Sequence, residues 1–358
     1  MKRLLILEDG SVYEGIAFGS DEFKVGELIF QTGMCGYQET LSDMSYYGQI
    51  VMMTYPAIGN VGINRDDFES MNPQLFGFVV KEYCDTPSNF RCEMTLDEYM
   101  KLKGIPGIAD VDTRAITRKI RDNGVMKATM ANEGADIDAI VAELKASSPS
   151  TDGVKQVSVA KPYAIPNRGG HKLVMLDLGS KYAVIRELNA RDCDLVSMPY
   201  DAKIDDIMAL KPDGVIISSG PGIPDYIPET VETVKQLAGK IALFGIGLGH
   251  LVIAQAFGAK IEAMKFGHHG NSTPIVNLEK NKVEFTAQNH RFDVNEDSLA
   301  GTGLKVTHRA LNDKSVEGFV HESLPVMGVQ FNPEAAPGAD DTMYVFDQFI
   351  EMLSKGAK

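Results

Sequence analysis

Beyond Gly170, short apolar runs alternate with amphipathic segments along the chain. The runs KLVMLDLG, CDLVSMPY, DGVIISSG and IALFGIG are predominantly apolar, which is typical of strands buried on both faces of a sheet. Segments with apolar residues at helical spacing follow them, as in KYAVIRELNARD and PETVETVKQLAG. This alternation predicts a parallel sheet with helices on both faces. Because ligands bind beyond the carboxyl ends of such strands, we expect chemistry in the loops after Leu178, Ser218 and Ile246.

The first 150 residues have a different pattern, with short apolar runs between frequent turn signals. LLILEDGSVYEGIAFG predicts two strands joined by an Asp-Gly turn. The segment DVDTRAITRKIRDNG predicts a helix that Asp112 or Thr113 caps. Its expected inner stripe consists of Ala115, Ile116 and Ile120. Its other face carries four basic residues, Arg114, Arg118, Lys119 and Arg121. That face is either solvated or a surface for a partner.

Between about Ser147 and Gly170 the chain is rich in Ser, Pro, Gly and Lys and has no clear periodicity. We therefore place one domain at residues 1–150, a linker at 151–170 and a second domain at 171–358. The second domain is expected to be α/β, with a central, mostly parallel sheet flanked by helices.

Composition narrows the classes of function. Thirty-five basic and forty-nine acidic residues give the 358-residue chain a net charge of −14, which argues against broad binding to nucleic acid or to anionic membranes. Four scattered cysteines without a C-x-x-C pair indicate neither a disulfide framework nor a structural zinc site, and favour a cytoplasmic setting. The apolar stretch 241–259 holds four glycines, a histidine and a glutamine, so we expect a buried strand, turn and helix there rather than a membrane span.

The string G-I-G-L-G at 245–249 joins the predicted strand IALFGI to the predicted helix HLVIAQAF. It has the frame of a nucleophile elbow, G-x-Nuc-x-G, in which flanking glycines allow a tight turn that lifts the middle side chain into a cleft. The middle residue here is Gly247, which has no side chain to react. Glycine tolerates the strained backbone of such a turn, so we expect the fold to persist without the nucleophile.

Longer strings resemble the small, glutamine-hydrolysing subunit of carbamoyl-phosphate synthetase, and together they span nearly the whole chain. They are LEDGSVYEGIAFG, FQTGMCGYQETLSDMSYYGQIV, TYPAIGNVGIN, EMTLDEYMKLKGIPGIADVDTRAITRKIR, ISSGPGIP, GIGLGH, KFGHHG, TAQNHRF and QFNPEAAPG. The N-terminal strings are the most specific, because other class I glutamine amidotransferases lack that domain. The resemblance implies an α+β small-subunit domain, a class I amidotransferase domain and a large-subunit partner. It places the cofactors, ATP and Mg, and the substrate bicarbonate on that partner and none on this chain.

In that family a Cys-His-Glu triad hydrolyses glutamine. The cysteine attacks, the histidine acts as base and then acid, and the glutamate orients the histidine. Carried onto this sequence, the cysteine position is Gly247, and the histidine position of the H-P-E string is Asn332. Glu334 matches the glutamate. Asparagine cannot exchange a proton near neutral pH, so the two groups that make bonds and move protons are expected to be missing.

The resemblance also assigns a glutamine pocket. The positions that match the family are Ser45, Gly220, Gly222, Leu248, Asn289 and Phe292. Three positions depart from it: Leu251 stands in place of a glutamine, Arg291 in place of a glycine, and Ile223 in place of the aspartate of G-P-G-D-P. Leu251 would leave a polar group of the ligand unpaired, at a cost of about 1–3 kcal/mol. Arg291 adds bulk and positive charge, and these changes make glutamine binding doubtful.

The leading interpretation is a structural or regulatory small subunit of an ammonia-using synthetase, whose product would feed pyrimidine or arginine synthesis. Two alternatives stay open: a working glutaminase subunit that supplies ammonia, and a pseudoenzyme paralogue that binds another small molecule. Cys35 is not expected to replace the nucleophile, because it lies in the N-terminal domain. No metal site is expected, because His268 and His269 are adjacent and lack partners at a ligand spacing.

Overall fold

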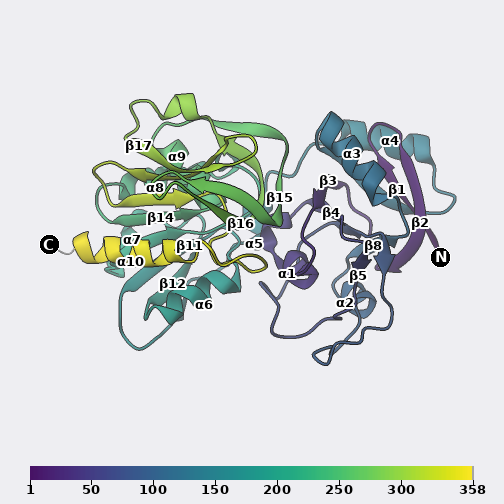
Figure 1. The fold of residues 1–358 in the computed structure, drawn as a ribbon, viewed down its shortest axis with the longest axis horizontal. Helices are drawn as coiled ribbons and strands as arrows, with labels where there is room; N and C mark the ends of the chain where they lie inside the picture. The colour runs from purple at the N-terminus through teal and green to yellow at the C-terminus, as the bar shows by residue number, and fades with distance from the viewer. Residues whose placement is uncertain (357–358) are drawn as a thin grey trace. The chain divides into compact units, whose positions relative to one another are not determined.

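The structure is a computed structural model that describes residues 1–356 (Figure 1). It divides into two compact units, Met1–Ser150 and Thr151–Lys358. Each unit has buried apolar clusters of its own, and each is described separately below. No helix within residues 1–356 is long and apolar enough to cross a membrane.

The N-terminal unit is built on a closed barrel of strands in the order β1-β2-β8-β6-β4-β3-β9. The strands of the unit are β1 (Lys2–Leu7), β2 (Val12–Gly19), β3 (Gly26–Gln31), β4 (Gln49–Met53), β5 (Ala57–Ile58), β6 (Gly77–Val79), β7 (Glu82–Tyr83), β8 (Pro106–Ala109) and β9 (Met126–Asn132). Its helices are α1 (Tyr37–Ser42), the 3-10 helix η1 (Met44–Tyr46), α2 (Leu96–Leu102), α3 (Thr113–Asn123) and α4 (Ile137–Ala146). The predicted hairpin is confirmed: β1 and β2 pair antiparallel, with Gly10 at φ 88° in the turn.

Helix α3 begins where the sequence predicts. The carboxylate of Asp112 accepts a hydrogen bond from the N–H of Ala115 at 2.9 Å and so caps the helix. Ile116 and Ile120 are buried as expected, but Ala115 is exposed and Thr113 is buried in its place. Thr113 and Ile116 are three residues apart and share a face of the helix, whereas adjacent residues are rotated by about 100°.

The C-terminal unit contains a ten-stranded sheet in the order β10-β12-β11-β13-β14-β19-β18-β17-β15-β16. Its strands are β10 (Tyr163–Ile165), β11 (Lys172–Asp177), β12 (Asp194–Pro199), β13 (Gly214–Ile217), β14 (Ala242–Ile246), β15 (Ile261–Asn277), β16 (Lys282–Val294), β17 (Leu304–Ala310), β18 (Val316–His321) and β19 (Val326–Val329). The central strands from β12 to β19 are parallel, as the apolar runs predict. The other strands extend the sheet antiparallel on both sides.

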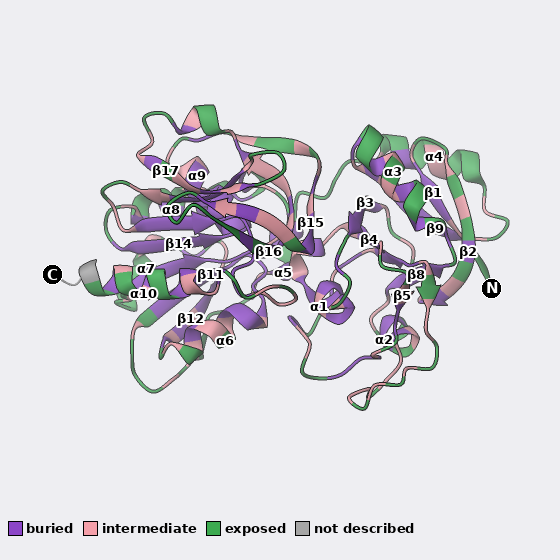
Figure 2. Cartoon of the chain, in the orientation of Figure 1, coloured by how far each residue is buried: buried purple, intermediate pink, exposed green. Residues whose placement is uncertain are grey.

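Helices pack on both faces of the parallel strands. The helices of the unit are α5 (Gly153–Val157), α6 (Tyr182–Ala190), α7 (Ile204–Ala209), the 3-10 helix η2 (Pro224–Tyr226), α8 (Pro228–Leu237), α9 (Leu248–Ala256), the 3-10 helix η3 (Glu296–Leu299) and α10 (Tyr344–Gly356). Along β11, Val174 and Leu176 pack in a cluster with α8 and α9, whereas Leu173 and Met175 pack in a cluster with α6 and α10. Figure 2 shows β14 as a buried strand. The apolar stretch 241–259 is β14 followed by α9, which confirms the predicted strand, turn and helix.

Residues 151–170, expected to be a linker, contain regular structure that belongs to the second unit. Helix α5 buries Val154 in an apolar cluster of that unit. Strand β10 pairs antiparallel with β12 and extends the sheet. The sequence pattern hid both elements because each is short and β10 lies at an edge with its first two residues exposed.

Candidate functional site

The turn between β14 and α9 places Gly247 at the carboxyl end of the parallel strands. Gly247 has φ 56° and ψ −112°, a conformation that residues with a side chain rarely adopt. Its N–H donates to the carbonyl of Val329 at 2.9 Å, which ties the turn to the end of the neighbouring strand β19. The backbone here is therefore a strained strand-to-helix elbow, as the sequence predicts.

The three glycines of the elbow differ in what a side chain would meet. A Cβ atom on Gly245 would lie 2.4 Å from the carbonyl oxygen of Gly249, and one on Gly249 would lie 2.0 Å from that of Ile217. Contacts this short cannot form, so both positions need glycine. A Cβ atom on Gly247 would meet nothing closer than Ser219 Cβ at 3.3 Å. The elbow thus has room for a small side chain at its middle position and carries none.

Asn332 lies in the loop after β19, close to this edge of the sheet. Strands β14 and β19 are parallel neighbours with Ile246 beside Val329, so the residues that follow both strands emerge together. The N–H of Asn332 donates to the carbonyl of Ala287 at 2.9 Å, which fixes the loop against β16. Its amide can donate and accept hydrogen bonds, but it cannot take up a proton near neutral pH.

Glu334 has a cationic partner that the sequence analysis missed. Lys181 Nζ lies 2.7 Å from Glu334 Oε1, and the two side chains are 1% and 0% exposed. Lys181 Nζ also donates to the carbonyl of Ala336. A buried pair of this kind balances two charges, neither of which could stay in the core alone. The signal that could have found it is position: Lys181 follows Leu178, in one of the three loops predicted to carry chemistry.

The loop after β13 lies beside the elbow and carries Gly220 and Gly222. A Cβ atom on Gly220 would lie 2.1 Å from the carbonyl oxygen of Leu178, so the backbones pack too closely for any other residue. Gly222 has φ 84°, in the left-handed region that favours glycine. Ser219, whose Cβ faces Gly247, has a buried hydroxyl with no hydrogen-bond partner among residues 1–356.

The start of α9 is apolar on its buried side. Leu248 and Leu251 both belong to the core cluster shared with α8 and the sheet. His250 lies between them, fully buried, with its ring stacked 4.4 Å from that of Phe319. Burial lowers the pKa of His250 to about 3, so the ring is uncharged at neutral pH. Leu251 offers no hydrogen bond at the position where the resemblance implies a glutamine.

Strand β16 carries the other pocket residues that the resemblance assigns. Asn289 Oδ1 lies 2.7 Å from His269 Nδ1, and Asn289 Nδ2 is buried without a hydrogen-bond partner in the described part of the chain. Burial lowers the pKa of His269 to about 4. The guanidinium carbon of Arg291 lies 5.6 Å from the ring centre of Phe292, its neighbour in sequence.

The sheet therefore brings one group of assigned residues to the same edge. Gly247, the loop that holds Gly220 and the segment 332–334 meet beyond the carboxyl ends of β13, β14 and β19. Strand β16 is joined to this group through the hydrogen bond between Asn332 and Ala287. Ser45 belongs to the N-terminal unit, where its N–H donates to the Asp43 carboxylate at 2.8 Å.

Comparison with known proteins assigns both halves of the chain to a family. Residues 5–130 match the carbamoyl-phosphate synthase small chain, CPSase domain, and residues 174–352 match glutamine amidotransferase class-I. The chain is 50% identical over 358 residues to the carbamoyl phosphate synthase small chain of Bacillus cereus, which covers 100% of this chain and 98% of that protein. It is 49% identical, with the same coverage, to the carbamoyl phosphate synthase pyrimidine-specific small chain of Bacillus subtilis.

A third relative, the carbamoyl phosphate synthase small chain of Bacillus caldolyticus, is 50% identical over 355 residues, or 99% of this chain and 97% of that protein. The two matched domains follow one another in the order that the resemblance implies. The chain belongs to the carbamoyl-phosphate synthase small-chain family, with a class I glutamine amidotransferase domain as its second half.

Proposed function

We propose that this chain is a carbamoyl-phosphate synthase small subunit that does not hydrolyse glutamine and that serves a synthetase using free ammonia. The observation that carries the proposal is the elbow at Gly247, which has the backbone of a nucleophile position and no reactive atom. Asn332 supports it, because the amide at the position of the catalytic histidine cannot act as a base.

The remaining groups support a structural or regulatory role. Lys181 neutralises the buried Glu334 carboxylate, so this carboxylate can stay charged and buried without a histidine partner. Leu251 completes an apolar core rather than a polar pocket. In this proposal the chain binds and stabilises a large subunit in the cytoplasm. That large subunit binds ATP and Mg and uses bicarbonate and ammonia, while this chain holds no cofactor of its own.

The test measures ammonia release from glutamine by the purified chain, alone and with its large subunit, and follows carbamoyl phosphate in parallel. We expect synthesis from added ammonium and none from glutamine above a buffer control. The large subunit alone is the matched control, and the small chain should raise its stability or its ammonia-dependent rate. Glutamine-dependent synthesis would overturn the proposal and restore the alternative of a working glutaminase.

A second candidate is a pocket that binds another small molecule. Two observations favour it: Ser219 Oγ and Asn289 Nδ2 are buried without hydrogen-bond partners among residues 1–356. Arg291 would add positive charge for an acidic ligand. A panel of small carboxylates, tested by thermal shift, should contain one that stabilises the natural chain and not Arg291→Gly. If no carboxylate raises the melting temperature, this candidate fails.

A further inference from the structure

Three side chains on antiparallel strands of the C-terminal sheet point their polar atoms at one another. His268 is on β15, His290 on β16 and Glu317 on β18, and we name them the histidine cluster. His268 Nδ1 lies 3.3 Å, and His290 Nε2 3.6 Å, from the same oxygen, Glu317 Oε1. The ligand atoms that the three residues offer all lie within 4.8 Å of one another. The side chains are 12%, 5% and 0% exposed, so the cluster is largely shielded from water.

Hydrogen-bond acceptors hold the ring nitrogens that face away from the cluster. His290 Nδ1 lies 3.1 Å from the carbonyl oxygen of Phe292, and His268 Nε2 lies 2.9 Å from Asp313 Oδ2. A neutral ring that donates through its outer nitrogen presents a lone pair at its inner nitrogen. Histidine ligands of metal ions are oriented in this way, by a carbonyl or carboxylate on the other nitrogen.

The interior of the cluster is rich in electron pairs and needs a positive charge. His290 Nε2 and Glu317 Oε2 are buried and make no hydrogen bond within residues 1–356. Two nitrogen lone pairs beside a carboxylate repel one another in a site that excludes water. One divalent metal ion would satisfy all three groups, and two protons, one on each ring, are the alternative.

We propose that His268 Nδ1, His290 Nε2 and the Glu317 carboxylate form a binding site for a divalent transition metal, and that Zn²⁺ fits best. Two imidazoles and a carboxylate, with water in the fourth position, are a ligand set that zinc uses. With bonds of about 2.0–2.1 Å, tetrahedral ligand atoms lie about 3.3–3.4 Å apart. The two distances to Glu317 Oε1, 3.3 Å and 3.6 Å, are close to that spacing.

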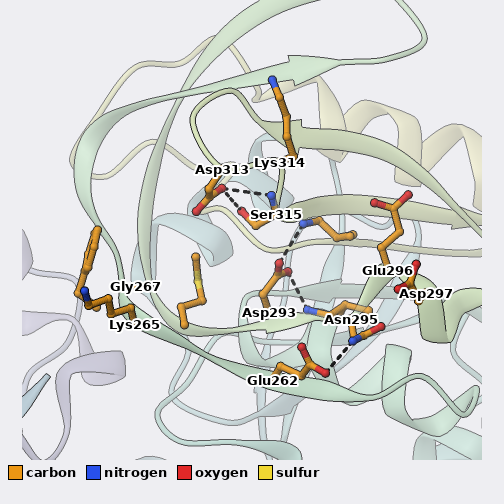
Figure 3. Close-up of a pocket in the computed structure, with 14 residues that line it drawn as sticks. Glu262, Lys265, Gly267, Asp293, Asn295, Glu296, Asp297, Asp313, Lys314 and Ser315 are labelled. Carbon is orange, nitrogen blue, oxygen red and sulfur yellow. Dashed lines mark hydrogen bonds between the residues drawn. The ribbon is translucent and has the colours of Figure 1, made fainter. Parts of the chain in front are cut away.

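The backbone and a neighbouring pocket favour such a site. Gly267 has φ 74°, and a Cβ atom there would lie 2.3 Å from the carbonyl oxygen of His290. The backbones of β15 and β16 therefore approach each other closely beside the cluster. Asp313 and Asp293 line an adjacent pocket of ≈ 550 Å³ (Figure 3). The pocket's other acidic residues are Glu262, Glu296 and Asp297, against Lys265 and Lys314. The net negative charge of this lining attracts cations. A cation in the pocket would lie near Asp313, whose carboxylate is hydrogen-bonded to His268 of the cluster.

Protons and metal compete for the same nitrogens. A histidine must lose the proton on its ligating nitrogen before it binds zinc, so zinc affinity should increase as the pH rises. Mg²⁺ and Ca²⁺ prefer oxygen ligands, so neither should compete effectively.

The experiment uses the purified full chain after treatment with a chelator and desalting. Zn²⁺ is titrated and bound zinc is counted after gel filtration, while Co²⁺ serves as a spectroscopic probe of coordination geometry. The variants are His290→Gln and Glu317→Gln. His321→Gln is the matched control, because His321 is a histidine on β18 outside the cluster.

We expect one zinc per chain in the natural protein and in the control, and a dissociation constant at least about 100-fold higher in both cluster variants. Bound Co²⁺ should show the strong visible absorption of tetrahedral coordination. This spectrum tests the natural chain by itself, even where a variant fails to fold. Absence of stoichiometric zinc, an octahedral cobalt spectrum, or equal affinity in folded cluster variants would each overturn the proposal and leave protons in the cluster. None of these readouts depends on glutamine hydrolysis.

Discussion

The turn at Gly247 and the histidine cluster lie in the same sheet, on strands of different kinds. At the turn, parallel strands lead into a helix through Gly247, where the backbone leaves room for a small side chain and glycine supplies none. In the cluster, antiparallel strands bring reactive atoms together at 3.3 Å and 3.6 Å, in residues outside the triad that the resemblance implies. The shape of this elbow depends on backbone contacts such as that of Gly249 with Ile217, which need no side chain at position 247. The histidine cluster also has a close backbone contact, that of Gly267 with His290, but it needs its three side chains as well.

Three substitutions can introduce the side chains that the resemblance implies at and near the elbow. They test whether the natural chain lacks only these side chains for glutamine hydrolysis. The triple variant Gly247→Cys, Asn332→His and Leu251→Gln should hydrolyse glutamine at least about 10³-fold faster than the natural chain, because nucleophile and base act as a unit. Ammonia release from glutamine, measured with the large subunit present, is the readout.

The matched controls for this repair are two partial variants. Gly247→Cys alone should give no useful gain, since the thiol has no base beside it. The double variant Asn332→His and Leu251→Gln lacks the nucleophile and should also stay inactive. Rapid hydrolysis by the single cysteine variant would show that our account of Asn332 is wrong.

The Lys181–Glu334 pair buries two opposite charges near the elbow. Lys181→Met should lower the free energy of unfolding by about 3–5 kcal/mol, because it leaves Glu334 charged and buried without a partner. Urea denaturation followed by circular dichroism measures the change. Adding Glu334→Gln should recover much of the loss.

An exposed lysine provides the comparison for this variant. Lys101 pairs with Asp97 at 2.6 Å, but its side chain is 60% exposed, so Lys101→Met should cost only about 0–1 kcal/mol. Equal losses for Lys101→Met and Lys181→Met would mean that the buried pair carries no special weight in stability.

Features that depend on residues close together in the sequence could be predicted, whereas contacts between residues far apart in the sequence were harder to predict. The parallel strands, their helices and the elbow depend on periodicity and on glycines close together, and the structure has them where the patterns place them. Periodicity and glycines do not reveal the buried partner of Glu334, which is distant in sequence; the position of Lys181 in the loop after β11 is the signal that points to it. The sequence analysis also did not predict the antiparallel strands of the sheet, because it relied on the alternation of strands with helices.

The expectation of no metal site stays a prediction, and it rested on spacing along the chain. It considered His268 and His269 because they are adjacent, but adjacent strand residues point to opposite faces. The residues that meet His268 come from β16 and β18, and their meeting depends on strand register, including a shift between Ala263 and His268. The spacing of residues along the chain does not show which residues of neighbouring strands lie side by side.

Removing the outer partner of His268 should have a smaller effect than removing a ligand. Asp313→Asn weakens the acceptor on His268 Nε2, and zinc affinity should fall by about 10–100-fold. Asp297→Asn is the matched control, since Asp297 lines the same acidic pocket and is not a hydrogen-bond partner of His268. Equal losses in both variants would indicate that the pocket acts only through its overall charge.

The smallest effect should come from adding a single methyl group at the elbow. Gly247→Ala should cost about 1–3 kcal/mol, because the strain of φ 56° is its main penalty and the nearest atom is 3.3 Å away. Gly249→Ala, two residues on, should cost clearly more, because its Cβ would lie 2.0 Å from the carbonyl oxygen of Ile217. Thermal unfolding of the two variants gives the order directly. If Gly247→Ala proved the more destabilising, the middle of the elbow would no longer be a place built to hold a side chain, and the turn would be an ordinary glycine turn.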